Sequence, residues 1–216
     1  YRVIVPRQGC CGLASQSNGL FDQARSSVVE LAAQLSRAGR DVPVVSSSGS
    51  CASMLKHEAH EIMGVDDPKV MDIGARMRET SEFLLDLYDA DELPTDFERI
   101  EMTIPYHAPC QVKGQGMGMP AVRLMELVPG ITVAESGENC CGIAGTYGLK
   151  KEKFEVAQAI GRPLFDKFKA SGAELGACDT ETCRWQIRKG TGMPIVHPIH
   201  VIHAAYGLSD IRSPEV

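Results

Sequence analysis

Short apolar runs alternate with longer, more polar segments along the whole chain. The short runs predict strands, at residues 2–5, 42–45, 102–106, 131–134, 174–178 and 195–197. The longer segments predict helices, at residues 20–38, 52–63, 69–89, 120–128, 149–170 and 199–206. Strands that alternate with helices indicate an α/β fold, in which parallel sheets are flanked by helices.

One sequence unit occurs twice. The letters CCG stand at residues 10–12 and again at 140–142. Residues 36–51 also correspond to residues 169–183, because each segment runs from a helix end through glycine into an apolar stretch and finishes on a cysteine. This self-similarity predicts two related cysteine-rich units, residues 1–92 and 93–216, each with a small parallel sheet.

The composition narrows the function classes. With 44% hydrophobic and 23% charged residues the chain is typical of globular proteins, and its net charge of −6 disfavours a nucleic-acid surface. No apolar run approaches the ~20 residues that span a bilayer. The chain opens at Tyr1 in an apolar run, and the repeat would place a further cysteine upstream of Cys10. We therefore expect a fragment whose first unit is truncated.

Eight cysteines dominate the candidate chemistry. Adjacent cysteines are poorly placed to bridge each other, because a disulfide prefers Cα atoms ~4.4–6.8 Å apart. Without a recognisable export signal, clustered thiols indicate metal binding or catalysis more than a disulfide framework. The candidate ligands, all but Cys178 just past a predicted strand end, are Cys10, Cys11, Cys51, Cys110, Cys140, Cys141, Cys178 and Cys183. Strand ends of a parallel sheet share one edge, so we expect the thiols of each unit to gather there.

The vicinal pairs bear on the kind of metal. Structural zinc usually binds thiols two to four residues apart, whereas cysteines without a spacer point in different directions and suit the separate irons of a cluster. The glycine after each pair permits a tight turn, and the following helix offers amide donors. An iron–sulfur centre is favoured, with a zinc scaffold as the alternative.

The pattern Cys … CysCysGly … Cys-x-x-Cys resembles the cysteine-rich CCG-domain family. The stretches CCGIAGTYGLKKEKFEVAQAIGRPLF, DTETCRWQI and HPIHVIHAAYGL look most like the C-terminal part of the CCG-containing subunit of anaerobic glycerol-3-phosphate dehydrogenases. That resemblance implies a non-catalytic electron-transfer subunit, which relays electrons from a flavin subunit toward quinone at the inner face of the cell membrane. Heterodisulfide reductase B and the lactate or glycolate oxidation subunits are also similar, so disulfide reduction at the cluster stays open.

The resemblance also implies a ligand set. Cys110 matches the leading cysteine of the motif, Cys140 and Cys141 the pair, and Cys183 the last cysteine, around a 4Fe–4S cluster, possibly noncubane. Thr180 stands where the family has another cysteine, and Cys178 lies two residues earlier, on the same side of an extended segment.

The first copy has Ser48 at the position of Thr180. Cys10, Cys11 and Cys51 remain there as ligands for an iron–sulfur cluster or for zinc.

Other residues give weaker signals. His107 lies close to Cys110 and could tune the cluster through a hydrogen bond or a proton transfer. His197, His200 and His203 are expected to be structural or surface histidines. Trp185 is expected either to shield the site from water or to fill the core.

Overall fold

The computed structural model describes residues 1–212, and the chain divides into two compact units between Glu79 and Thr80. Each unit contains parallel strands and helices, so the predicted α/β class with small parallel sheets is confirmed. Within residues 1–212, none of the helices combines the length and the apolar character that a bilayer crossing requires.

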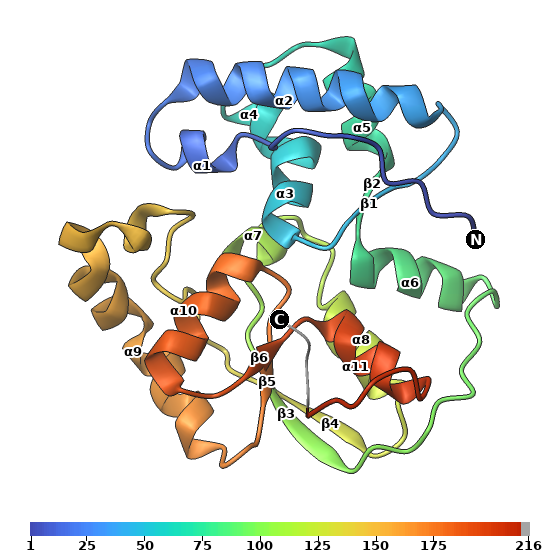
Figure 1. The fold of residues 1–216 in the computed structure, drawn as a ribbon, viewed down its shortest axis with the longest axis vertical. Coiled ribbons are helices and arrows are strands. Elements are labelled where there is room, and N and C mark those ends of the chain that lie inside the picture. Colours follow the sequence, from blue (N-terminus) through green and yellow to red (C-terminus); the bar gives the residue numbers. More distant parts are fainter. Residues whose placement is uncertain (213–216) are drawn as a thin grey trace. The chain divides into compact units, whose positions relative to one another are not determined.

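The first unit packs helices against a two-stranded sheet (Figure 1). Strand β1 (Val44–Ser46) pairs in parallel with β2 (Met77–Glu79). The helices, in chain order, are α1 (Leu13–Gln16), α2 (Phe21–Leu35), η1 (Ser36–Ala38), α3 (Gly49–Ser53), the π-helical η2 (Met54–Glu58), α4 (Ala59–Glu61) and α5 (Pro68–Arg76).

Helix α2 provides one side of the core of the first unit. Its residues Ala24, Val28 and Leu31 are buried at helical spacing, and they belong to the same hydrophobic cluster as Ile73 of α5. Helix α5 begins at Pro68, where the carboxylate of Asp67 accepts hydrogen bonds from the backbone N–H groups of the first turn.

The second unit is built on a four-stranded parallel sheet in the order β4-β3-β5-β6. Its strands are β3 (Met102–Tyr106), β4 (Ile131–Glu135), β5 (Gly176–Ala177) and β6 (Ile195–Val196). Its helices are α6 (Thr80–Asp89), α7 (Cys110–Lys113), α8 (Pro120–Glu126), η3 (Tyr147–Leu149), η4 (Lys151–Lys153), α9 (Phe154–Ala170), α10 (Glu181–Thr191) and α11 (Pro198–Ala205).

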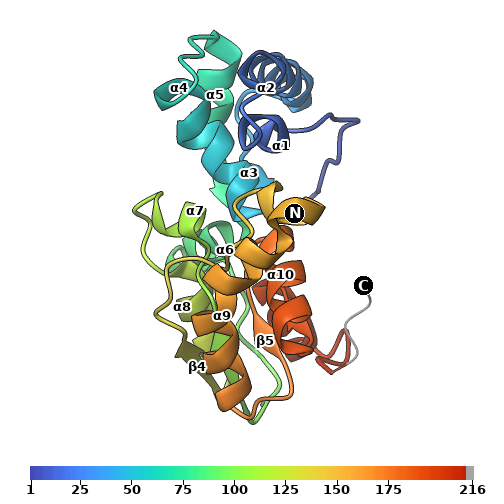
Figure 2. The same cartoon turned by 90° about the vertical axis from the view of Figure 1, so that its left-hand side faces the viewer.

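Two hydrophobic clusters flank this sheet. One joins Ile104 and Tyr106 of β3 to buried residues of α8 and α11. The other joins α9 and α10, which pack side by side (Figure 2), through Phe165, Phe168 and Ile187. Cys141, Cys178 and Cys183 belong to this second cluster, so those three thiols are embedded in packed apolar side chains.

Several predicted elements differ from the structure. Residues 2–5 form no strand, and Val3 and Val5 are exposed, since an apolar run becomes a strand only when a neighbouring strand pairs with it. The predicted helix at 69–89 is interrupted by β2, because the backbone turns extended at Met77 and pairs with Val44. Residues 181–191 form helix α10, so Cys183 lies in a helix and not in the predicted loop.

Candidate metal centre

Four separate segments of the second unit deliver cysteines to one edge of its sheet. Cys110 begins α7 shortly after β3, and Cys140 and Cys141 follow β4. Cys178 comes directly after β5, and Cys183 lies in the first turn of α10. All five therefore lie beyond the carboxyl ends of parallel strands, where the sheets of α/β proteins place their binding crevices.

The five thiols form one continuous row. Hydrogen bonds join Cys110 to Cys140, Cys140 to Cys141, Cys141 to Cys183, and Cys183 to Cys178. The row runs from exposed Cys110 through half-buried Cys140 to three buried thiols. No disulfide joins the cysteines within residues 1–212. The structure thus gathers the five candidate ligands of the second unit, Cys178 included.

The glycine of the CCG motif allows the long helix α9 to approach the pair. Gly142 has φ +89°, and a Cβ atom there would stand 2.1 Å from the carbonyl oxygen of Ala157. Gly161 is equally restricted, because its Cβ would stand 2.4 Å from the carbonyl oxygen of Cys141. Only glycine fits both the left-handed backbone and the contact at Gly142.

The first unit repeats this arrangement. Gly12 has φ +88°, and its Cβ would stand 2.7 Å from the carbonyl oxygen of Ala24 in the following helix. The N–H groups of Gly12 and Gly142 both donate to the sulfur two residues earlier, at 3.4 Å and 3.3 Å. The repeated letters therefore encode a repeated turn, in which the first sulfur of each pair accepts an amide proton.

Cys140 is the thiol that its neighbours favour as an anion in the metal-free protein. Hydrogen bonds from Cys110 and then from Cys141 lower the pKa of Cys140 to about 2. The hydrogen bond to Cys140 raises the pKa of Cys141 to about 12, and the pKa values of Cys110 and Cys183 also rise. Gathering all five as thiolates would require a compensating positive charge, which a metal centre supplies. The donor set therefore fits a thiophilic metal centre.

Two lysines hold the loop that carries the pair. Lys113 of α7 donates to the carbonyl oxygen of Glu138 at 2.6 Å. Lys167 of α9 donates to the carbonyl oxygen of Ser136 at 2.8 Å and forms an ion pair with Glu138 at 2.6 Å. These contacts fix the approach to Cys140, and they place two positive charges along a loop that ends in thiolate ligands.

His107 is buried next to this loop, directly after β3. Its Nδ1 lies 3.3 Å from the hydroxyl oxygen of Ser136. Burial, and then the charge of Lys113, lower the pKa of His107 to about 4, against the opposite influence of Cys140 and Glu138. The imidazole is therefore neutral near pH 7.

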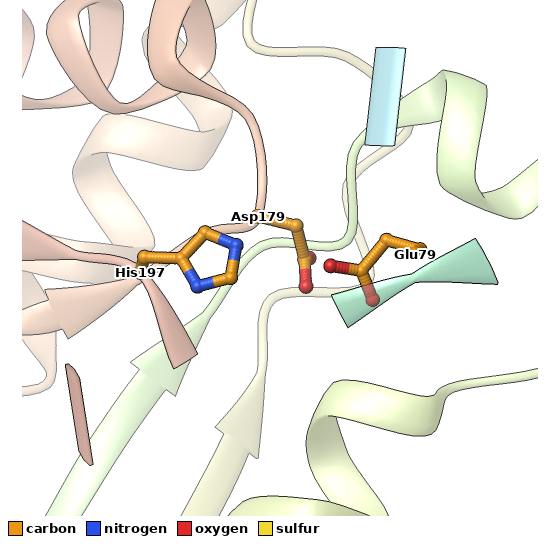
Figure 3. A group of neighbouring side chains, drawn as sticks. All are labelled: Glu79, Asp179 and His197. Carbon is orange, nitrogen blue, oxygen red and sulfur yellow. The ribbon is translucent and has the colours of Figure 1, made fainter. Parts of the chain in front are cut away.

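A second buried polar group lies behind Cys178. The hydroxyl of Tyr106 donates to the carboxylate of Asp179, and burial raises the pKa of that carboxyl to about 6. Figure 3 shows the carboxylate of Asp179 and the ring of His197 facing each other, with their nearest polar atoms within 4.8 Å; Glu79, also drawn, ends the first unit. Sequence reasoning did not single out Asp179, although an acidic residue directly after a strand-end cysteine was a usable signal.

The remaining histidines and the tryptophan have plain roles or surroundings. His197 caps α11, because its Nδ1 accepts the N–H of Ile199 at 3.0 Å, which agrees with a structural role. His203 is exposed and contacts Ser209. Trp185 is 57% exposed and therefore fills no core; with Arg188 and Lys189 it lines a shallow hollow of about 370 Å³.

The first unit brings two of its three cysteines into direct contact. The sulfur of Cys11 donates to the sulfur of Cys51 at 3.2 Å, and this contact, together with burial, raises the pKa of Cys11. Cys10 is exposed and next to Cys11 in the chain. Cys51 lies in α3, and buried Ser48 precedes that helix, as Thr180 precedes the helix that holds Cys183.

Comparison with known proteins agrees with this geometry. The profile of the cysteine-rich domain (CCG) matches residues 2–56 and 104–188, which contain all eight cysteines. The chain belongs to the cysteine-rich domain (CCG) family, and the resemblance predicted from its cysteine pattern is confirmed.

Curated relatives come from several respiratory and metabolic systems. The third subunit, named C, of the anaerobic glycerol-3-phosphate dehydrogenase of Escherichia coli is 32% identical over 94% of this chain and 50% of its own length. Lactate utilization protein A of Oceanobacillus iheyensis is 25% identical over 91% of this chain and 81% of its own. The second subunit, named B, of the fumarate reductase (CoM/CoB) of Methanothermobacter marburgensis is 30% identical over 75% and 30%. The chain thus spans about half the length of the Escherichia coli relative.

Replacing the motif glycine should destabilise the second unit. We expect Gly142→Ala to lower the free energy of unfolding by about 3 kcal/mol or more, because left-handed strain adds to a clash with the backbone of α9. Urea denaturation measures the change. Gly172→Ala is the matched control, since Gly172 has φ +65° with nothing within 4 Å of its Cβ position; it should lose only about 1 kcal/mol. Equal losses in the two variants would contradict the close approach of α9.

The lowered pKa of Cys140 predicts selective alkylation of the metal-free protein. At pH 5 an ordinary thiol, with a pKa of ~8.5, is almost fully protonated and unreactive toward iodoacetamide. Cys140 stays a thiolate at that pH, so peptide mass spectrometry should find it labelled first. Cys110→Ser removes the main donor to its sulfur and should slow the labelling at pH 5 but not at pH 9. Uniform labelling of the five cysteines at pH 5 would refute the assignment.

Proposed function

We propose that this chain is an iron–sulfur electron-transfer protein and that the second unit holds the cluster. The ligands would be Cys110, Cys140, Cys141, Cys178 and Cys183. The observation that carries the proposal is the unbroken row of five sulfurs, assembled from four segments of the chain. A tetrahedral zinc ion takes four ligands at most, so a row of five thiols that includes a vicinal pair suits a multinuclear centre better.

The bound centre would supply one-electron transfer, and the protein would supply binding and shielding. Buried Cys141, Cys178 and Cys183 would hold the inner side away from water, among the apolar residues of α9 and α10. The exposed side at Cys110 leaves a short route to a redox partner. No acid–base step is required of the ligands.

The biological role that we propose is that of a subunit in an anaerobic glycerol-3-phosphate dehydrogenase. The chain would relay electrons from a flavin-containing subunit toward quinone, at the cytoplasmic face of the cell membrane. The similarity to the Escherichia coli dehydrogenase subunit, which covers 94% of this chain, supports this choice. The lactate utilization and fumarate reductase relatives support the broader statement that the chain is a subunit of an oxidoreductase system.

We also propose a second metal centre on Cys10, Cys11 and Cys51 of the first unit, either iron–sulfur or zinc. The contact between the sulfurs of Cys11 and Cys51 supports it, as does the turn that it shares with the second unit. Three thiols leave at least one metal coordination position for another ligand.

Metal analysis and a matched pair of variants test these proposals. Anaerobically purified full-length protein should contain iron and acid-labile sulfide, and Cys140→Ser should lose the share held by the second unit. In the assembled complex this variant should abolish quinone reduction while glycerol-3-phosphate oxidation with an artificial acceptor continues. Cys51→Ser, which alters only the first unit, is the control for the second centre.

Three outcomes would count against these proposals. Zinc without iron would reject electron transfer. Loss of both activities in Cys140→Ser would reject the relay. Cluster-dependent cleavage of a disulfide substrate by the isolated protein would favour a heterodisulfide-type reductase instead.

A further inference from the structure

His107 is held in place by the main chain on both sides of its sheet position. Its backbone N–H donates to the carbonyl oxygen of Ala177 at 3.0 Å, which continues the pairing of β3 with β5. The residue has no exposed surface, and Cys110 follows three positions later. The ring therefore has a fixed position beside the segment that delivers the first ligand.

The hydrogen bonds of Ser136 determine which ring nitrogen carries the proton. The hydroxyl oxygen of Ser136 accepts the N–H of Glu138 at 3.3 Å and lies 3.3 Å from Nδ1 of His107. A hydroxyl that already accepts an amide proton still has its own proton to donate. Donation of that proton to Nδ1 leaves the second nitrogen, Nε2, as an N–H donor.

This Nε2 is buried and has no hydrogen-bond partner within residues 1–212. A buried donor without an acceptor costs about 1–3 kcal/mol, so such atoms in proteins usually face a bound group. The neighbouring charges indicate which group. Negative charge on Cys140 acts on the imidazole and favours a proton on it, and positive charge on Lys113 opposes one. The nearest anionic acceptors are therefore the sulfurs of the candidate centre.

We propose that Nε2–H of His107 donates a hydrogen bond to a sulfur of the metal centre, either the thiolate of Cys140 or an inorganic sulfide. The inference rests on the proposed iron–sulfur function and assigns His107 as a positioning residue that tunes the centre. A hydrogen bond to sulfur withdraws negative charge from the iron and favours the reduced state, so it raises the reduction potential. Ser136 supports the bond by fixing the tautomer.

Two substitutions separate the hydrogen bond from simple packing. In His107→Gln the side-chain amide can place an N–H near the position of Nε2, whereas in His107→Asn the shorter amide reaches only the position of Nδ1. We expect the midpoint potential, measured by EPR-monitored titration of the full-length protein, to fall in His107→Asn and to stay near the wild-type value in His107→Gln. His203→Asn alters the exposed histidine–serine pair of α11 and should change nothing.

Equal potentials in all three variants, with iron content intact, would overturn the inference. So would an equal fall in the Gln and Asn variants, which would indicate packing alone.

A measurement on the unsubstituted protein does not depend on the folding of any variant. With ¹⁵N-labelled histidine, pulsed EPR of the reduced centre should detect a weak coupling to one histidine nitrogen. Iron and sulfide without any such coupling would overturn this inference and leave the proposed function standing. Absence of iron and sulfide would overturn both.

Discussion

The close approach of a helix backbone to the vicinal cysteine turn is the constraint on which the rest of the second unit depends. Helix α9 passes so near that Gly142 and Gly161 have no room for a side chain, and Gly142 must also adopt a left-handed backbone. This contact aims Cys140 and Cys141 at the edge of the sheet, where Cys110, Cys178 and Cys183 arrive from other strands. Gly12 and Ala24 repeat the contact in the first unit. A motif of three letters therefore specifies a backbone geometry as well as two ligands.

Electrostatics explains why so many thiols can share one place in a folded protein. As thiols they hydrogen-bond to one another along the row, and a single thiolate at Cys140 accepts from its neighbours on both sides. The amide of Gly142 adds a third donor to that sulfur, and Lys113 and Lys167 bind the preceding loop. The apolar residues around Cys178 and Cys183 would disfavour further negative charge. The site is consequently stable without metal and is also prepared for a cation that accepts sulfur ligands.

The sequence allowed the fold class, the duplication and the convergence of Cys110, Cys140, Cys141 and Cys183 to be predicted, because these depend on local spacing and on the shared edge of parallel strands. It did not reveal helix α10, since Thr180 is extended immediately before it and the segment around Cys183 is mostly polar. It also did not reveal β2, because the strand is three residues long and lies between two helices. The environment of Asp179 was equally hidden, because Tyr106, which binds its carboxylate, lies 73 positions away in the chain. Long-range pairings of this kind leave no local signal.

The gradient of burial along the sulfur row has a chemical consequence. Cys110 stands in solvent, whereas Cys178 at the other end is completely enclosed. Oxygen, peroxide or a chelator arriving from water would meet the outer end first, and the enclosed end would keep its grip longest. Damage and repair of a centre built here would thus follow a direction set by the architecture, with the helix that starts at Cys110 as the first point of failure and the last to be rebuilt.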